Sequence, residues 1–130
     1  SVEMGVLDAC DRAGMGLVAF CPLGQGVLTD RYLKDIPADS RAGSGIGFLK
    51  REQITPELRK TVIALNEIAQ GRGQSLAAMA LCWLLRRPTV CTVLVGASRV
   101  EQLEENVKAT RNARPFSEDE LARIDQVLGK

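Results

Sequence analysis

The first part of the chain places its apolar residues in two different patterns. Val2, Val6 and Cys10 recur at the spacing of one helix face, and Gly14 suits the left-handed position just past a helix end. The run Leu17–Phe20 is apolar without alternation, which is typical of a short strand buried on both faces. We therefore predict a helix that ends near Gly14, followed by a buried strand.

The second part of the chain repeats this order with clearer boundaries. Thr55 suits the N-cap of a helix, and Pro56 suits its first position. Ser75 suits the cap of the next helix, which Pro88 stops. Residues 92–95 then form another short apolar run. These patterns predict two helices followed by a second buried strand.

Two further helices are indicated by the capping-box motif, a serine followed three residues later by a glutamate. The motif occurs at Ser98 with Glu101 and at Ser117 with Glu120, each before a helix with an apolar side. Residues 36–53 differ from these segments, because they are rich in Pro, Asp, Ser and Gly and have no period. We predict a long mobile loop there.

The order of these elements predicts a parallel α/β fold with strands at about residues 16–20 and 92–95. Two strands are too few, because a parallel sheet needs both faces covered and both edges paired. The remaining strands belong either to a part of the protein outside this sequence or to another chain. Since Ser1 lies within a predicted helix, we expect residues 1–130 to be a single piece of a longer protein.

Composition excludes several classes of function. Basic and acidic residues nearly cancel, to a formal charge of +1, so a nucleic-acid or anionic-membrane partner is not expected. No apolar run is long enough to span a bilayer and the first residues do not form a basic signal, so we expect a cytoplasmic protein.

The four cysteines are far apart, without a Cys-x-x-Cys pair, and the chain has no histidine. We therefore expect no metal site. Cys10, Cys82 and Cys91 lie on or beside apolar faces, where buried free thiols are common, so we expect reduced cysteines.

Candidate chemistry lies at the carboxyl ends of the two strands, where parallel α/β proteins place ligand sites. The second strand leads through Gly96, Ser98 and Arg99 into a helix N-terminus, an arrangement that suits a phosphate. Residues 20–26, with two glycines and a proline, follow the first strand. The alternatives are that Ser98 only caps its helix and that residues 20–26 are only a turn.

The segments CPLGQGVLTDRY and GASRVEQLEEN, each after a strand, together resemble the seventh and eighth strand-loop units of aldo-keto reductases. The similarity is greatest to the branch of L-glyceraldehyde phosphate reductases and potassium-channel β subunits. It implies that the chain is the C-terminal portion of a (β/α)8 TIM barrel that binds NADPH across the carboxyl ends of its strands.

The resemblance assigns each loop a part of the cofactor. Phe20 would lie against the nicotinamide, residues 21–24 and Gly26 would line the pyrophosphate, and Arg31 and Arg41 would reach phosphates. Three residues of the second loop would hold the adenosine 2'-phosphate and three of the following helix would meet the adenosine. Residues 36–53 would be either a strap over the cofactor or only a flexible linker. The cofactor-binding residues so implied are Phe20, Cys21, Pro22, Leu23, Gly24, Gly26, Arg31, Arg41, Gly96, Ser98, Arg99, Gln102, Glu105 and Asn106.

The family's catalytic Tyr, Lys, Asp and His come from early strands, and none can be placed in this sequence, where Tyr32 is the only tyrosine. We therefore expect the parent to reduce small carbonyl substrates, aldehydes or ketones, and this chain alone to be inactive. Two alternatives stay open: a nucleotide-sensing subunit like the channel β subunits, or a stand-alone non-catalytic chain that forms homo-oligomers.

Overall fold

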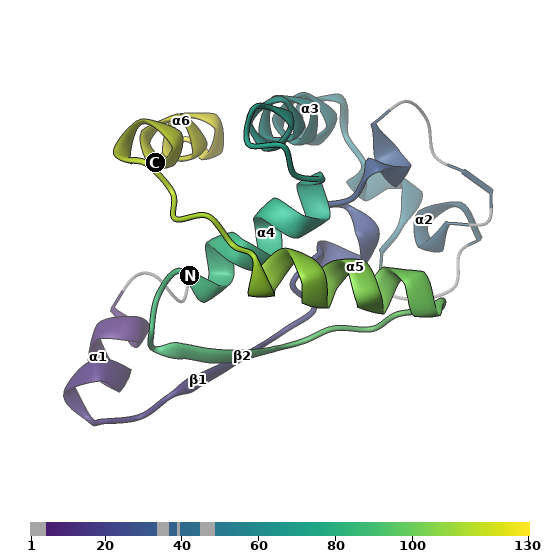
Figure 1. Cartoon of the computed structure of the whole chain (residues 1–130). Coiled ribbons are helices and arrows are strands. Elements are labelled where there is room, and N and C mark those ends of the chain that lie inside the picture. The colour runs from purple at the N-terminus through teal and green to yellow at the C-terminus, as the bar shows by residue number, and fades with distance from the viewer. Residues whose placement is uncertain (1–4, 34–36, 39, 45–48) are drawn as a thin grey trace.

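The computed structural model describes residues 5–33, 37–38, 40–44 and 49–130, and its arrangement is drawn in Figure 1. Three single turns of 3-10 helix lie at Gly24–Gly26, Asp30–Tyr32 and Arg51–Gln53. The helices and strands are, in chain order, α1 (Val6–Arg12), β1 (Leu17–Phe20), α2 (Arg41–Ser44), α3 (Pro56–Gly71), α4 (Leu76–Leu85), β2 (Val90–Leu94), α5 (Val100–Arg111) and α6 (Glu118–Leu128).

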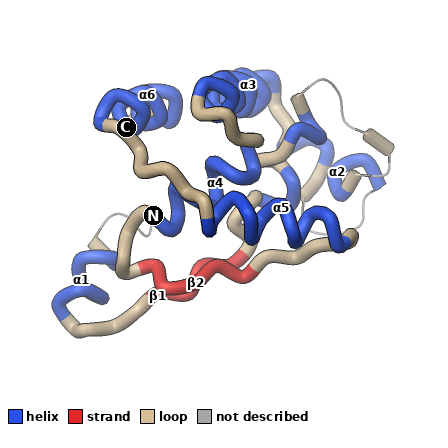
Figure 2. Tube along the Cα trace, in the orientation of Figure 1, coloured by secondary structure: helices blue, strands red, loops and turns tan. Residues whose placement is uncertain are grey.

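The two strands pair in parallel, as the sequence predicts, and β2 begins two residues before the expected position 92. Figure 2 shows the two strands side by side in red. Phe20 is opposite Leu94 at the carboxyl end. The register shifts between Leu17 and Val18: Leu17 pairs with Val90 and Val18 pairs with Thr92, so Cys91 is skipped in the pairing. Glycine at position 16 leaves room for this irregularity, because a Cβ atom there would clash with the Cys91 sulfur. The parallel pairing brings the loops after β1 and β2 to one edge of the sheet.

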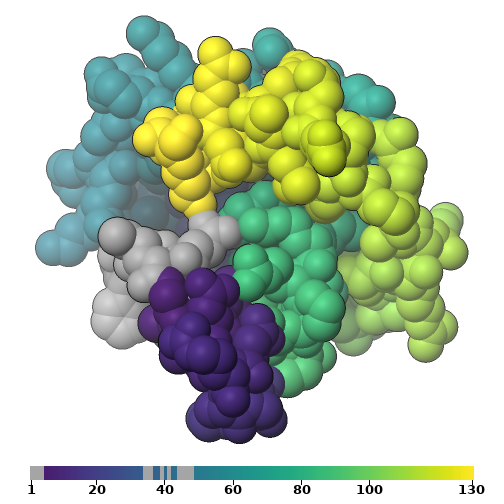
Figure 3. All heavy atoms as spheres, turned by 90° about the vertical axis from the view of Figure 1, so that its left-hand side faces the viewer, coloured from purple at the N-terminus to yellow at the C-terminus, as the bar shows by residue number. Residues whose placement is uncertain are grey.

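Four helices form two layers on one side of the sheet, α4 and α5 next to the strands and α3 and α6 beyond them (Figure 1). α4 packs on β2 and against α5, and α3 packs on α4 and α6. Buried residues of α3, α4 and α6 form the main core: Val62, Leu65, Ile68, Ala69, Leu76, Met79 and Ile124. Viewed from the side of α1, Figure 3 shows α1 in purple and α6 in yellow at opposite edges of the molecule, with the green segment before β2 between them.

The prediction that both strands are buried on both faces is wrong for this chain. Val18, Phe20 and Leu94 are 54%, 76% and 59% exposed. In contrast, Ala19 and Val93 are half-buried. The helices cover only one face of the sheet, and the other face stays open in the described part of the chain. Cys91 is exposed, contrary to expectation, whereas Cys82 is buried as expected.

The prediction of a long mobile loop at residues 36–53 is wrong in part, because some of the described residues of this segment form helical turns. Ile36, Asp39 and residues 45–48 lie outside the described residues. This segment contains α2 and a 3-10 turn, and a second cluster of buried residues consists of Tyr32, Ala42, Leu49 and Ile54. The Tyr32 hydroxyl accepts a hydrogen bond from the Ala42 N–H at 3.3 Å. A few apolar side chains and one buried phenol therefore fold a segment whose composition indicated a loop.

Three predicted helix caps are confirmed. The hydroxyls of Thr55, Ser75 and Ser117 each accept a hydrogen bond from the backbone N–H three residues later. Across the described residues, no helix is both long enough and apolar enough to cross a bilayer.

Candidate functional site

The candidate cofactor site lies at the edge of the sheet where β1 and β2 end. Because Phe20 pairs with Leu94, residues 21–26 and residues 95–99 leave the sheet side by side. Phe20 exposes most of its ring at this edge. The structure thus brings the two sequence segments of the predicted site together.

The loop after β1 is a tight turn with unusual backbone angles. Cys21 and Gln25 have φ values of 52° and 57°, and Gly24 and Gly26 have φ values of 54° and 99°. Residues other than glycine adopt positive φ infrequently and at a cost in free energy, and such positions cluster at functional sites. The backbone of this loop is therefore held in a specific shape.

Hydrogen bonds within the loop maintain that shape. The N–H groups of Gly24 and Gly26 donate to the carbonyls of Cys21 and Leu23, both at 3.0 Å, and the Thr29 hydroxyl donates to the Gly26 carbonyl at 2.6 Å. Because these two N–H groups are engaged, a phosphate beside this loop would have to be bound by other donors. Pro22 and Leu23 are half-buried beside them.

The helix after β2 does not begin as the sequence predicts. α5 starts at Val100, with Arg99 at the N-cap and no side-chain capping hydrogen bond, so the predicted capping box of Ser98 and Glu101 is wrong. Gln102 replaces it, because its side-chain oxygen accepts from the Ser98 N–H at 3.0 Å and from the Ser98 hydroxyl at 3.2 Å. The helix begins one residue later than the box requires, which places Gln102 within reach of Ser98.

Around this turn the remaining predicted residues are accessible. Gly96 is exposed, and a Cβ atom built on it would meet no described atom within 4 Å. Arg99 and Glu105 are exposed, and Asn106 is half-buried on the same helix as Gln102. The turn is therefore open enough to admit a nucleotide phosphate.

Arg31 and Arg41 are the two arginines that were predicted to reach phosphates of the cofactor. Arg31 is exposed, and its backbone N–H donates to the Thr29 hydroxyl at 3.3 Å. Arg41 is the first residue of α2, and its side chain lies outside the described residues.

The single tyrosine of the sequence, Tyr32, has a structural role. Tyr32 is 2% exposed and its oxygen is hydrogen-bonded to the backbone of Ala42, so it holds α2 in place. Within the described ranges, no three His, Cys, Asp or Glu side chains lie close enough together to bind a metal ion.

A cluster of charged side chains lies away from this edge, at the N-terminus of α6. The Arg72 side chain, 1% exposed, forms an ion pair with Glu120 and lies over the Phe116 ring at 3.7 Å. Glu120 also pairs with Arg114 at 2.7 Å. The hydrogen bond from the Ser117 N–H, followed by the charges of Arg72 and Arg114, lowers the pKa of Glu120, although partial burial opposes the shift. This cluster joins α3 to α6.

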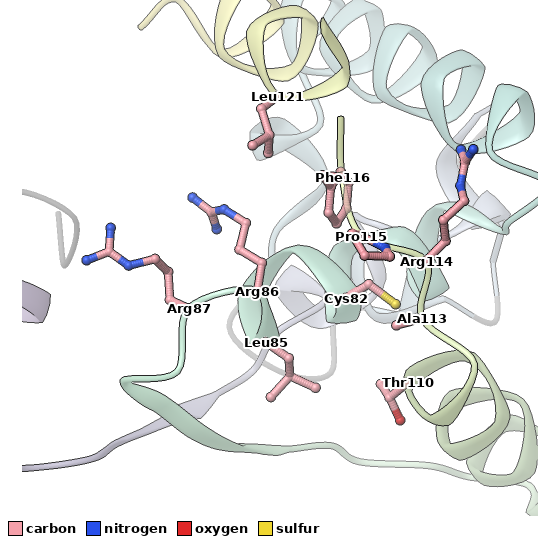
Figure 4. Close-up of a pocket in the computed structure, with 10 residues that line it drawn as sticks. All are labelled: Cys82, Leu85, Arg86, Arg87, Thr110, Ala113, Arg114, Pro115, Phe116 and Leu121. Atoms are coloured by element: carbon pink, nitrogen blue, oxygen red, sulfur yellow. The ribbon is translucent and has the colours of Figure 1, made fainter. Parts of the chain in front are cut away.

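A pocket of about 560 Å³ lies between the C-terminal ends of α4 and α5 and the segment before α6 (Figure 4). Its lining includes none of the predicted cofactor residues. Arg86 and Arg87 line it just before β2 begins, so the pocket is at the amino end of that strand. Arg86 stacks on the Trp83 ring at 3.6 Å, and Arg87 pairs with Asp8 at 3.3 Å. The pocket and the candidate cofactor site are therefore at opposite ends of β2.

Comparison with known proteins identifies the family and the fold of this chain. The chain belongs to the aldo/keto reductase family, whose family model matches residues 1–128. This confirms the resemblance stated from the two loop motifs. The parallel strands and their helices are accordingly a portion of the (β/α)8 barrel of that family.

Particular relatives include both enzymes and channel subunits. L-glyceraldehyde 3-phosphate reductase of Escherichia coli O157:H7 is 51% identical over 127 residues, which cover 95% of this chain and 36% of the relative. A probable voltage-gated potassium channel subunit beta of Oryza sativa subsp. japonica is 38% identical over 129 residues, which cover 98% of this chain and 39% of the relative. A putative subunit of the same kind from Schizosaccharomyces pombe is 35% identical, with 97% and 38% covered. The chain thus spans a little over a third of the length of these relatives.

Proposed function

We propose that this chain is the cofactor-binding part of an NADPH-dependent reductase that converts aldehydes or small ketones to alcohols. The observation that carries the proposal is that two loops with the family's motifs leave paired parallel strands at one edge of the sheet. We also propose a cytoplasmic location, supported by four free cysteines, since thiols persist in reducing compartments.

The residues at this edge fit the parts of NADPH. The exposed ring of Phe20 offers a flat apolar surface for the nicotinamide. The open space at Gly96 lets a ligand approach the backbone closely. Arg99, with a guanidinium that suits phosphate oxygens, is exposed at the N-terminus of α5, where the helix dipole favours an anion. When bound, NADPH would supply the hydride for the reduction.

The proton for the carbonyl oxygen needs a positioned acid. In this chain the Tyr32 hydroxyl is buried at a structural contact and the sequence has no histidine, so we propose that the acid comes from the remainder of the barrel. On this proposal the 130-residue chain binds cofactor but does not reduce carbonyl compounds by itself.

Sequence similarity favours a reductase over a nucleotide-sensing channel subunit. The two L-glyceraldehyde 3-phosphate reductases are 50% and 51% identical to the chain, whereas the channel subunits are 35% to 38% identical. A phosphorylated aldehyde such as L-glyceraldehyde 3-phosphate is thus the first substrate to assay with the complete protein. The loss of NADPH absorbance with it, or with a panel of other aldehydes, would support the proposal, and no loss with any of them would refute it.

Cofactor choice is tested with the substitution Arg99→Ala. It should weaken NADPH binding by about tenfold or more and change NADH binding little, because only NADPH carries the 2'-phosphate that the guanidinium would bind. Titration calorimetry with both nucleotides measures this, and Arg123→Ala, at an exposed position on α6, is the control. Equal weakening of both nucleotides would refute the role of Arg99.

A further inference from the structure

Tyr32 contacts two segments that lie apart in the sequence. Its side chain is 2% exposed, and its hydroxyl oxygen accepts a hydrogen bond from the Ala42 N–H of α2 at 3.3 Å. The ring also lies beside the loop after β1, since a Cβ atom built on Gly26 would be 3.6 Å from the Cε2 atom of Tyr32. Tyr32 therefore joins α2 to one of the two loops of the candidate cofactor site.

Two further contacts connect this loop to the buried cluster around Tyr32. Val27, which directly follows the loop, packs against that cluster and also against the main core. The Thr29 hydroxyl donates to the Gly26 carbonyl at 2.6 Å and accepts from the Arg31 N–H at 3.3 Å, so it connects the end of the loop to the 3-10 turn that carries Tyr32. The loop is thus held by contacts outside it as well as by its own hydrogen bonds.

We propose that Tyr32 is a positioning residue for the cofactor. By holding α2 and the loop after β1 together, it keeps the loop in the conformation that binds the nicotinamide and pyrophosphate part of NADPH. The inference rests on the proposed function and deepens it. Tyr32 acts through the loop and does not touch the cofactor, because its side chain is buried.

The backbone conformation of the loop requires such support. Gln25 and Gly26 have φ values of 57° and 99°. Positive φ at a residue other than glycine costs free energy and persists where the surrounding contacts determine it. If those contacts are removed, the loop populates other conformations, and the affinity for a ligand falls with the fraction of the chain that is competent to bind. The loss of one hydrogen bond can change such an equilibrium by about two- to tenfold.

The test compares NADPH with adenosine 2',5'-bisphosphate, a probe that has the adenosine end of the cofactor and lacks its nicotinamide half. Tyr32→Phe should lower the affinity of the chain for NADPH by about two- to tenfold and change that for the bisphosphate by less than about twofold, because this probe leaves the loop after β1 largely unused. Tyr32→Leu, which also removes the ring from beside Gly26, should lower the ratio of the two affinities further.

The ratio of the two affinities separates positioning from folding, because a general loss of folded chain would weaken both ligands alike. Thr61→Val is the matched control. It removes a hydroxyl that donates to the Glu57 carbonyl within α3 at 3.2 Å, and it should leave the ratio unchanged.

Amide hydrogen exchange tests the coupling between α2 and the loop without nucleotide. In Tyr32→Phe the Ala42 N–H should exchange faster, because it loses its acceptor. The Gly26 N–H, which donates to the Leu23 carbonyl at 3.0 Å and not to Tyr32, should also exchange several-fold faster, because the loop is held less firmly. Faster exchange at Ala42 alone would overturn the coupling.

The binding results distinguish failure of this proposal from failure of the proposed function. An unchanged affinity ratio in both Tyr32 variants, while the unsubstituted chain binds NADPH, would overturn the role of Tyr32 and leave the proposed function intact. Failure of the unsubstituted chain to bind NADPH would overturn the proposed function and, with it, the role of Tyr32 toward the cofactor.

Discussion

The N-termini of α5 and α6 carry the same sequence motif but are built differently. At α6, Ser117 and Glu120 form the reciprocal capping box, and Glu120 is held by Arg72. At α5, Ser98 caps nothing and instead donates to Gln102. The difference teaches that a capping motif forms a box when other contacts fix its glutamate. Where the helix can start one residue later, the serine is left for a different contact.

The largest expected effect comes from breaking the contacts behind the α6 box with Arg72→Ala. The variant removes a buried guanidinium that bonds Glu120 and the Arg114 carbonyl and lies over the Phe116 ring, so the free energy of unfolding should fall by about 2 to 3 kcal/mol. Urea denaturation measures the change. Arg123→Ala, one helical turn beyond Glu120 and exposed, should change it by less than about 0.5 kcal/mol. A cost below about 1 kcal/mol for Arg72→Ala would mean that α6 does not depend on this pair.

Replacing each of the two serines with alanine gives a matched pair of variants, for which we expect smaller losses of stability. Ser117→Ala should destabilise the chain by about 0.5 to 2 kcal/mol, because it removes a real cap. Ser98→Ala should cost less than about 0.5 kcal/mol, because its hydroxyl makes only an exposed bond to Gln102. Thermal and urea unfolding of both variants tests the comparison. Equal costs would show that Ser98 caps α5 in solution.

The smallest expected effect is the pH dependence of the α6 box. The lowered pKa of Glu120 means that its stabilising contribution is fully present above its unfolded value of about 4.3 and is lost as the pH falls through the lower folded value. The difference in unfolding free energy between the wild-type chain and Glu120→Gln should therefore shrink from pH 6 to pH 3. A constant difference over this range would contradict the shift.

Much of this molecule follows from local patterns in the sequence. Thr55, Ser75 and Ser117 cap helices where the motifs place them, and the apolar runs become a parallel pair of strands. The open face of the sheet could not be predicted from Val18 or Phe20, because an apolar run indicates that both faces are to be covered but not which residues cover them.

The position of the candidate site could be predicted from the sequence, but the backbone conformation and the hydrogen bonds of its loops could not. The two loops meet as their strand ends require. The positive φ of Gln25 had no sequence signal, because residues other than glycine adopt it infrequently. The contact between Gln102 and Ser98 was missed because a more familiar motif, Ser98 with Glu101, overlaps it. A glutamine four residues after a serine is the only signal that could have indicated it.

The irregular register at Cys91 has a consequence for how this protein tolerates changes in length. Because the pairing passes over Cys91, Phe20 faces Leu94 rather than Val93. A residue gained or lost within Leu17–Phe20 or Val90–Leu94 would turn the following side chains to the other face of the sheet and offset the two loops. Insertions beyond Phe20 and Leu94 would leave unchanged which face of the sheet each strand side chain occupies, so the spacing inside the strands is the stricter constraint on the length of the chain.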